Sequence, residues 1–384
     1  MLDESLLDAP EALARADHRG LLRGAAEAGA RVRTAARHAD EAGIGALSPE
    51  GRPRAVLIAG PGTAATCVAD LVTALAGTSA PVTHLHPTGV APAAGALRWA
   101  LPGWAGSLDL LLIATTDGAE PGLALLAQQA YRRGVTVVAV APHRAPLTEA
   151  VNGSHGLLVP LATAPHETYE EIQPAGPGAL WALFTPLLAL LDRVGLLTAP
   201  ADTLEKVADR LDRAAERCGP AIATYSNPAK TLAAELADTL PLIWTEGETA
   251  APVGRRFAAV MAELAGRPAL AAQLPEALPA HGGLLAGDLA AGADPEDFFR
   301  DRVEDPQALH ARVVLLRDRP ADAGGLTAAP AARELALGHD TAVSELEPEP
   351  GSELEALAEL LAVTDFAAGY LTLASSPLNP DSTR

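Results

Sequence analysis

The residues with the clearest chemistry follow an apolar stretch in DLLLIATTDGAEPGLALLAQQA (109–130). The pattern predicts a buried strand, a tight polar turn and then a helix. Because the first N–H groups of a helix are unpaired and carry a partial positive charge, such a turn can bind a phosphate. The turn is therefore a candidate substrate-binding site. Its residues are Thr115, Thr116, Asp117 and Gly118.

Two carboxylates, Asp117 and Glu120, lie where the phosphate would bind. Unit charges about 4 Å apart, at an effective dielectric near 20, repel by on the order of 4 kcal/mol. Asp117 also has the position of a helix N-cap, with Glu120 three residues later, close to a capping box. Two interpretations stay open: a sugar site that disfavours phosphate, or a capped start of the helix.

A second turn follows the apolar stretch RAVLIAG (54–60) and opens a helical stretch. Gly60, Gly62 and Ala65 match the G-x-G-x-x-G/A fingerprint of dinucleotide sites. That fingerprint also needs an acidic residue at the end of the next strand, where THLHPTG has none. We therefore expect no nicotinamide or flavin cofactor. Two alternatives stay open: the glycines permit a tight strand-to-helix turn, or a small phosphosugar approaches the same turn at Gly60, Gly62 and Thr63.

No residue pattern predicts a bound metal. His84 and His86 lie two apart on a predicted strand and so share a face, but no third ligand is close in the sequence. Cys67 and Cys218 fit neither a metal spacing nor a disulfide framework. We interpret both cysteines as small buried residues.

The bulk composition narrows the class of partner. The chain has 384 residues and a formal net charge of −20, without a cluster of Lys and Arg, so we expect no nucleic-acid partner. No apolar run is long enough to span a bilayer, and the acidic N-terminus is unlike a secretory signal. We therefore expect no membrane partner and a cytoplasmic location. An anionic metabolite can still bind at a local site.

Short apolar strands alternate with helices through the first half, and the alternation restarts after a polar helix at 201–219. This pattern is typical of parallel sheets covered on both faces. We therefore predict an α/β fold of two tandem three-layer α/β/α domains of flavodoxin-like type, residues 1–198 with a helical N-terminal extension and residues 199–384. The predicted strands are 54–60, 81–86, 109–116, 135–140, 155–161, 240–246, 311–318 and 341–349.

The order of several motifs resembles one family, the bifunctional phosphoglucose/phosphomannose isomerases with two sugar-isomerase (SIS) domains. SNPAKTLAAELADTLPLIW (226–244) is similar to the family's Asn-Pro-Ala-Lys helix and following strand. ELAGRPALAAQLPEALPAHG (263–282) is similar to its E-N-x-K-x-P-A…L-P-E…H-N-E segment. LIAGPGTAA and TTDGAEPG take the places of its G-M-G-G-S-G and S-x-S-G-x-T-E-E turns. The resemblance spans nearly the whole chain and implies SIS domains, aldose–ketose isomerisation of a sugar phosphate, and a homodimer.

The resemblance also implies roles for residues of the second half. Glu263 falls on the family's catalytic base, which moves a proton between adjacent sugar carbons, and its alternative role is a plain carboxylate on a helix face. The family's histidine falls on Pro279, and His281 is the candidate replacement. Arg255, in the pair with Arg256, is a candidate for binding an anionic ligand or for a surface ion pair.

Other positions depart from the family's pattern. The phosphate-binding hydroxyls fall on Ala64, Thr115, Asp117 and Glu120. Of these residues, Thr115 alone keeps a hydroxyl. The family's ring-opening arginine falls on Gly178, and its C-terminal lysine has no counterpart. Two functions stay open: a phosphosugar isomerase of the glucose 6-phosphate/mannose 6-phosphate type, or a non-catalytic homologue that binds a sugar or sugar phosphate.

Overall fold

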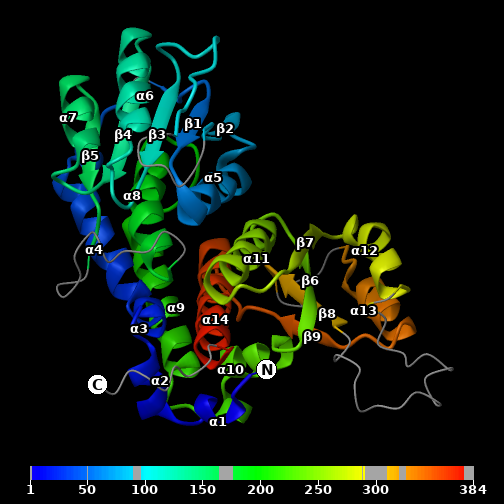
Figure 1. The fold of residues 1–384 in the computed structure, drawn as a ribbon. Helices are drawn as coiled ribbons and strands as arrows, with labels where there is room; N and C mark the ends of the chain where they lie inside the picture. The colour runs from blue at the N-terminus through cyan, green and yellow to red at the C-terminus, as the bar shows by residue number, and fades with distance from the viewer. Residues whose placement is uncertain are drawn as a thin grey trace, which may run out of the picture. The chain divides into compact units, whose positions relative to one another are not determined.

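The computed structural model describes residues 2–49, 51–89, 97–163, 176–287, 289, 309–319 and 326–375 (Figure 1). The chain forms two compact units that are divided within helix α9 (Ala201–Cys218). The five-stranded unit comprises Arg23–Asp212, and the four-stranded unit combines Met1–Leu22 with Arg213–Arg384. Each unit is an α/β structure with its own sheet and is described by itself.

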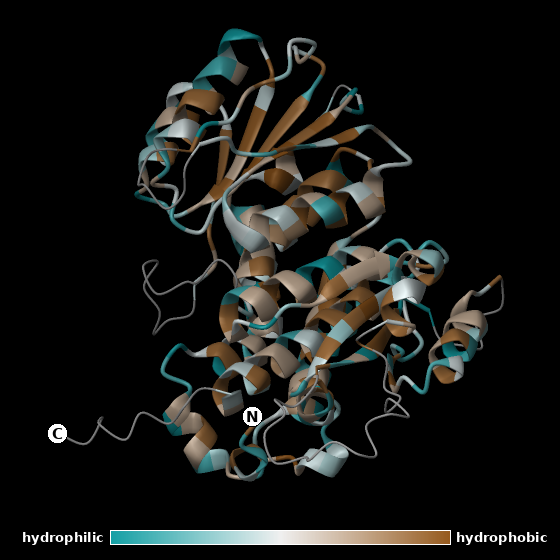
Figure 2. Cartoon of the chain, turned by 45° about the vertical axis from the view of Figure 1, so that its right-hand side comes forward, coloured by the Kyte–Doolittle hydropathy of each residue, from teal (hydrophilic) through white to brown (hydrophobic). Residues whose placement is uncertain are grey.

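The five-stranded unit is built on a parallel sheet in the order β2-β1-β3-β4-β5. All residues of its central strands β1 (Val56–Ala59) and β3 (Leu110–Ala114) are buried, as expected for apolar strands with helices on both faces. Figure 2 shows the central strands of this sheet as hydrophobic. The other elements are α4 (Ala28–Glu41), η1 (Ile44–Ala46), α5 (Gly62–Ala76), β2 (Val82–Leu85), α6 (Pro121–Arg132), β4 (Thr136–Ala141), α7 (Pro146–Gly153), β5 (Leu157–Pro160) and α8 (Ala179–Arg193).

The four-stranded unit is built on a second parallel sheet, in the order β7-β6-β8-β9. Its core is formed by apolar residues of β6 (Thr239–Glu246) and β8 (His310–Arg317) together with helix residues that cover them. The short helix α3 (Leu21–Ala26) lies at the division between the units. The other elements are α1 (Glu4–Leu7), α2 (Pro10–Ala16), η3 (Thr224–Ser226), α10 (Pro228–Leu236), α11 (Ala250–Ala265), β7 (Leu270–Gln273), α12 (Ala277–Leu285), α13 (Ala329–Gly338), β9 (Val343–Leu346) and α14 (Glu353–Ser375).

The predicted fold class is confirmed, since both sheets are parallel and alternate with helices along the chain. Each predicted strand has a counterpart in the structure. Strand β7 was not predicted from the sequence. Its four residues, LAAQ, contain no β-branched or aromatic side chain, and they lie partly exposed on the edge of their sheet.

The first residues of the chain belong with the last ones, in the four-stranded unit. The backbone N–H of Asp3 donates to the carbonyl oxygen of Ala374 at 2.9 Å. The Asp8 carboxylate accepts from the N–H of Thr224 at 2.8 Å and from its hydroxyl at 2.9 Å. The two units therefore divide at 212/213, whereas the sequence places a boundary at 198/199 and counts the first helices with the first domain.

Helix α14 is the central helix of the four-stranded unit. Among the described residues, it is the one helix long and apolar enough to cross a membrane, and its apolar stretch is entirely buried inside the protein. Its polar groups have internal partners: the Tyr370 hydroxyl donates to the carbonyl oxygen of Cys218 at 2.6 Å, and Asp365 forms an ion pair with Arg256 of α11. Arg256 is therefore a structural residue of the core.

Replacing Tyr370 with Phe removes the hydroxyl that donates to the Cys218 carbonyl oxygen. Both residues are fully buried, so the carbonyl loses its partner, and we expect the free energy of unfolding to fall by about 1–3 kcal/mol. Urea denaturation followed by circular dichroism measures this change. Tyr225→Phe is the matched control, because Tyr225 is 89% exposed. Equal effects of the two substitutions would contradict the role given to the buried hydroxyl.

Candidate functional site

Two turns of the five-stranded unit meet at the carboxyl edge of its sheet. Strands β1 and β3 are neighbours, with β2 on the far side of β1 and β4 on the far side of β3. This reversal of strand order is a topological switch point, where open α/β sheets bind their ligands. The turns after β1 and β3 therefore lie side by side. The predicted binding residues that they carry are Gly60, Gly62, Thr63, Thr115, Thr116, Asp117 and Gly118.

The glycines after β1 permit a close approach of two backbones. A Cβ atom on Gly60 would lie 2.0 Å from the carbonyl oxygen of Ala114, at the end of β3, and 2.7 Å from the Cβ of Ala65. Gly62 has a φ of +79°, which side-chain-bearing residues rarely adopt. The match to the dinucleotide fingerprint is thus accounted for by packing between neighbouring turns.

The turn after β3 uses its own side chains to satisfy its backbone. The Thr115 hydroxyl accepts from the N–H of Gly118 at 3.0 Å and donates to the Asp117 carboxylate at 3.2 Å. The same carboxylate accepts from the N–H of Ala119 at 3.0 Å. Two amide groups of this turn, those of Gly118 and Ala119, are therefore already hydrogen-bonded.

The capping-box interpretation of this turn is wrong. Glu120 itself is the N-cap residue of α6, and neither its side chain nor that of Asp117 bonds to the first turn of the helix. The sequence misled because Pro121 moves the start of the helix three residues beyond Asp117. One carboxylate oxygen of Glu120 is buried and has no hydrogen-bond partner among the residues that the structure describes.

The electrostatics of this edge disfavour a dianion. The carboxylate of Asp117 is exposed at the turn, and that of Glu120 lies at the end of α6. With the amides of Gly118 and Ala119 occupied and two carboxylates present, the turn offers mainly hydrogen-bond acceptors. A ligand that donates hydrogen bonds, such as a sugar hydroxyl or an ammonium group, matches these acceptors.

The corresponding edge of the four-stranded unit is closed by an ion-pair network. Strands β6 and β8 form its switch point, and Arg317 donates to Glu246 at 2.8 Å and to Glu347 at 2.6 Å. Asp318 accepts from the N–H and the hydroxyl of Thr249, both at 3.2 Å. Its carboxylate fills the space where a Cβ on residue 247 would lie, 1.9 Å away. These polar groups bind one another.

Hydrogen bonds determine the charge state of this network. Burial alone would raise the pKa of Glu246, but hydrogen bonds from Thr327, Arg317 and the N–H of Ala328 together hold it below the usual range. Sequence reasoning missed these residues. The signal was present, since each of the apolar strands LPLIWTE, RVVLLRD and VSELE is followed or ended by charge at the same edge.

The two predicted catalytic residues lie at opposite ends of strand β7. Glu263 is exposed in the last turn of α11, just before β7 begins. His281 lies on α12, which follows β7. Since α11 spans 16 residues, its ends are about 24 Å apart, and Glu263 is at the end remote from the carboxyl edge. Arg255 is exposed in the middle of α11. Within this unit, the topology does not bring these three residues together.

His281 is held by a tryptophan. The indole N–H of Trp244 donates to Nδ1 of His281 at 2.9 Å, and the histidine is 8% exposed. Burial lowers the pKa of His281. The ring therefore stays neutral near pH 7, with Nδ1 as an acceptor and its proton on Nε2.

The remaining predictions from the sequence concern Gly178 and a possible metal site. Gly178 has a φ of +89°, and a Cβ there would lie 2.7 Å from Nε of Arg31 and 2.9 Å from the carbonyl oxygen of Gly24, so a side chain at this position is strained. Within the described ranges, no three His, Cys, Asp or Glu side chains gather as a metal site. His84 and His86 face each other with ring centroids 4.1 Å apart, and burial lowers the pKa of His84.

Comparisons with known proteins agree with this architecture. Residues 225–381 match the family described as bacterial phospho-glucose isomerase C-terminal SIS domain. No curated protein matches the chain.

Three solved structures illustrate the shared fold. A "putative phosphosugar isomerase" from Clostridium difficile 630 is 12% identical with a TM-score of 0.59, over 94% of this chain and 96% of that one. A hypothetical protein from Thermus thermophilus is 15% identical with a TM-score of 0.58, over 97% and 91%. The C-terminal domain of glucosamine-fructose-6-phosphate aminotransferase from Francisella tularensis is 14% identical with a TM-score of 0.50, over 94% and 96%. At these identities, the likeness concerns the fold.

The environment of His281 predicts a pH dependence of stability. Because its folded pKa lies below that of the unfolded chain, the unfolded chain binds more protons as the pH falls from 7 to 5, and stability is lost. We expect the free energy of unfolding to fall more steeply over this range than in His281→Gln. Urea unfolding at several pH values measures the difference. His143→Gln, at an exposed site, is the control. The prediction is refuted if the free energy of unfolding of His281→Gln changes with pH as steeply as that of the unmodified protein.

Proposed function

We propose that this chain, whose residues 225–381 match the bacterial phospho-glucose isomerase C-terminal SIS domain family, is a sugar-binding SIS protein whose isomerase chemistry is largely lost. The proposed ligand is a neutral sugar or an amino sugar. It binds in the five-stranded unit, where the turns after β1 and β3 meet. The proposal depends mainly on one observation: in the turn after β3, the amides of Gly118 and Ala119 are bonded to the side chains of Thr115 and Asp117.

The chemistry of this turn supports a ligand that donates hydrogen bonds. A sugar hydroxyl donates as well as accepts, and a carboxylate acceptor strengthens such a bond by its charge. The exposed carboxylate of Asp117 is available for this role. A phosphate dianion, in contrast, only accepts hydrogen bonds and carries the same sign of charge as the carboxylate.

The catalytic groups implied by the family resemblance are dispersed or replaced. Glu263 and His281 lie at opposite ends of β7, and His281 already accepts a hydrogen bond from Trp244. Gly178 stands where the family has an arginine, and its positive φ disfavours any side chain there. Because catalytic groups that act together fail together, the loss of several leaves little residual rate.

An active isomerase is the second candidate, and one observation favours it. Glu263 lies inside the matched segment and is exposed at the end of α11, where a substrate can reach its carboxylate. On this hypothesis Glu263 is the base that moves a proton between adjacent carbons of a sugar phosphate. Activity measurements separate the two candidates.

Ligand-induced stabilisation tests the sugar site. At a concentration of 100 times Kd, a ligand stabilises the folded state by about 2.7 kcal/mol. We expect glucosamine or glucose to raise the melting temperature of the protein and glucose 6-phosphate to leave it unchanged. Asp117→Ser removes the charge and adds a hydroxyl, so this variant should gain a response to glucose 6-phosphate.

Asp202→Ser is the matched control for that experiment, because it makes the same change of charge at an exposed position in the first turn of α9. It should respond like the unmodified protein. Stabilisation of the unmodified protein by glucose 6-phosphate, equal to that by glucosamine, would rule out the preference assigned to Asp117.

Turnover tests the loss of chemistry. We expect purified protein at high concentration to convert fructose 6-phosphate into glucose 6-phosphate or mannose 6-phosphate no faster than buffer does, as followed by NMR. Glu263→Gln then changes nothing. If turnover is detected, lost in Glu263→Gln and kept in Glu334→Gln, an exposed control on α13, the active isomerase is correct and the proposal of lost chemistry fails.

A further inference from the structure

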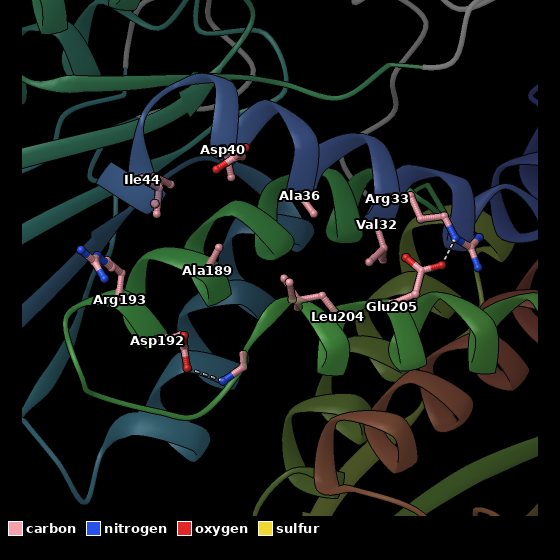
Figure 3. Close-up of a pocket in the computed structure, with 14 residues that line it drawn as sticks. Val32, Arg33, Ala36, Asp40, Ile44, Ala189, Asp192, Arg193, Leu204 and Glu205 are labelled. Atoms are coloured by element: carbon pink, nitrogen blue, oxygen red, sulfur yellow. Dashed lines mark hydrogen bonds and ion pairs between the residues drawn. The ribbon is translucent and has the colours of Figure 1, made fainter. Parts of the chain in front are cut away.

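The five-stranded unit contains a hollow away from the two turns at its sheet edge. It has a volume of about 570 Å³ and lies between α4, η1, the end of α8 and the first turn of α9 (Figure 3). None of the residues that line it belongs to the turns after β1 and β3. Its size falls within the roughly 300–1,000 Å³ of small-molecule sites in proteins.

Small side chains create this hollow. On α4, Val32, Ala36 and Ala39 are four and three residues apart and share one helix face. Figure 3 shows Val32 and Ala36 facing Ala189 of α8 and Leu204 of α9. Three helices meet here, and five of the fourteen lining residues are alanine, so their short side chains leave a space with partly apolar walls unfilled.

Hydrogen bonds hold the walls in place without a ligand. The Asp192 carboxylate accepts from the N–H of Ala199 at 2.8 Å, which fixes the connection from α8 to α9. Arg33 of α4 donates to Glu205 of α9 at 2.7 Å, as Figure 3 shows. Arg193 donates to the carbonyl oxygen of Leu47 at 2.6 Å. The hollow is therefore preformed, which reduces the entropy lost on binding.

The charges around the hollow favour a cation. Three carboxylates and two guanidinium groups line it, and Arg33 is shared with two further carboxylates, Asp209 and Asp212, at 2.6 and 2.7 Å. In the part of the chain that the structure describes, the Asp40 carboxylate has neither a hydrogen bond nor an ion pair. A chain with a net charge of −20 also attracts cations at long range.

We propose that this hollow binds a small organic cation with an apolar body. The apolar body lies against Val32, Ala36 and Ala189, and the charged group pairs with Asp40. The site is separate from the proposed sugar site, because the two share no residue.

Three probes of equal chain length test the proposal: hexylammonium, 1-hexanol and hexanoate. Saturation-transfer NMR and calorimetry measure their binding to the full chain. We expect hexylammonium to bind in a saturable way and more tightly than hexanol, and hexanoate to bind more weakly than either. Asp40→Asn should weaken hexylammonium by about two- to fivefold and leave hexanol unchanged, as expected for one ion pair at the mouth of a site.

Glu41→Gln is the matched control for charge, because Glu41 is the next residue of α4 and does not line the hollow. Ala36→Leu and Ala189→Leu fill the hollow from two different walls, and each should abolish binding of hexylammonium and hexanol while circular dichroism shows a folded protein. Two leucine variants are used so that the test still stands if one of them fails to fold. Equal binding of hexanoate and hexylammonium, absence of hexylammonium binding, or unchanged binding by a folded leucine variant would overturn the proposal.

Discussion

Parallel pairing of the first and third strands of each unit is the constraint on which the rest of the architecture depends. Because β1 pairs with β3 in parallel register, the chain leaves both strands at the same edge. Strand β2 lies outside β1 and β4 outside β3, so nothing of the sheet covers the two turns. The pairing of β6 with β8 repeats this arrangement in the four-stranded unit. Any polar residue that follows one of these four strands is thereby placed at a switch point.

The two units use their switch points differently, and short segments account for the difference. After β3, TTDG folds onto itself, so that its side chains satisfy its backbone and leave an exposed carboxylate. At the end of β8, Arg317 and Asp318 reach across to β6 and its following turn, and bury their charges there. One edge thus keeps acceptors for a ligand, whereas the other is stabilised by internal ion pairs. In our proposal, ligand binding belongs to the edge of the five-stranded unit, and the ion pairs stabilise the edge of the four-stranded unit.

The sequence predicts the fold well because apolar strands in a parallel sheet are recognisable without knowledge of their neighbours. For the same reason, the sequence also predicts where the turns after β1 and β3 lie. It does not predict which backbone groups the Asp117 side chain binds, because this depends on a shift of the helix start by Pro121. The pair of Arg317 with Glu246 and the pair of Arg256 with Asp365 join residues 71 and 109 positions apart, and no local pattern marks them. The hollow beside α4 depends on three segments meeting and is equally invisible in any one of them.

The N-terminal segment belongs to the four-stranded unit, most of which is synthesised last, and this affects folding during translation. Leu6, Leu7 and Leu13 are buried in the finished protein, and they pack with a unit whose remaining residues begin at Arg213. At a translation rate of about 5–20 residues per second, the residues that bury these leucines are synthesised tens of seconds after the leucines themselves. The five-stranded unit is complete first, as an insertion within the other. The nascent polypeptide thus has an exposed apolar segment near its N-terminus for long enough that a chaperone can bind it.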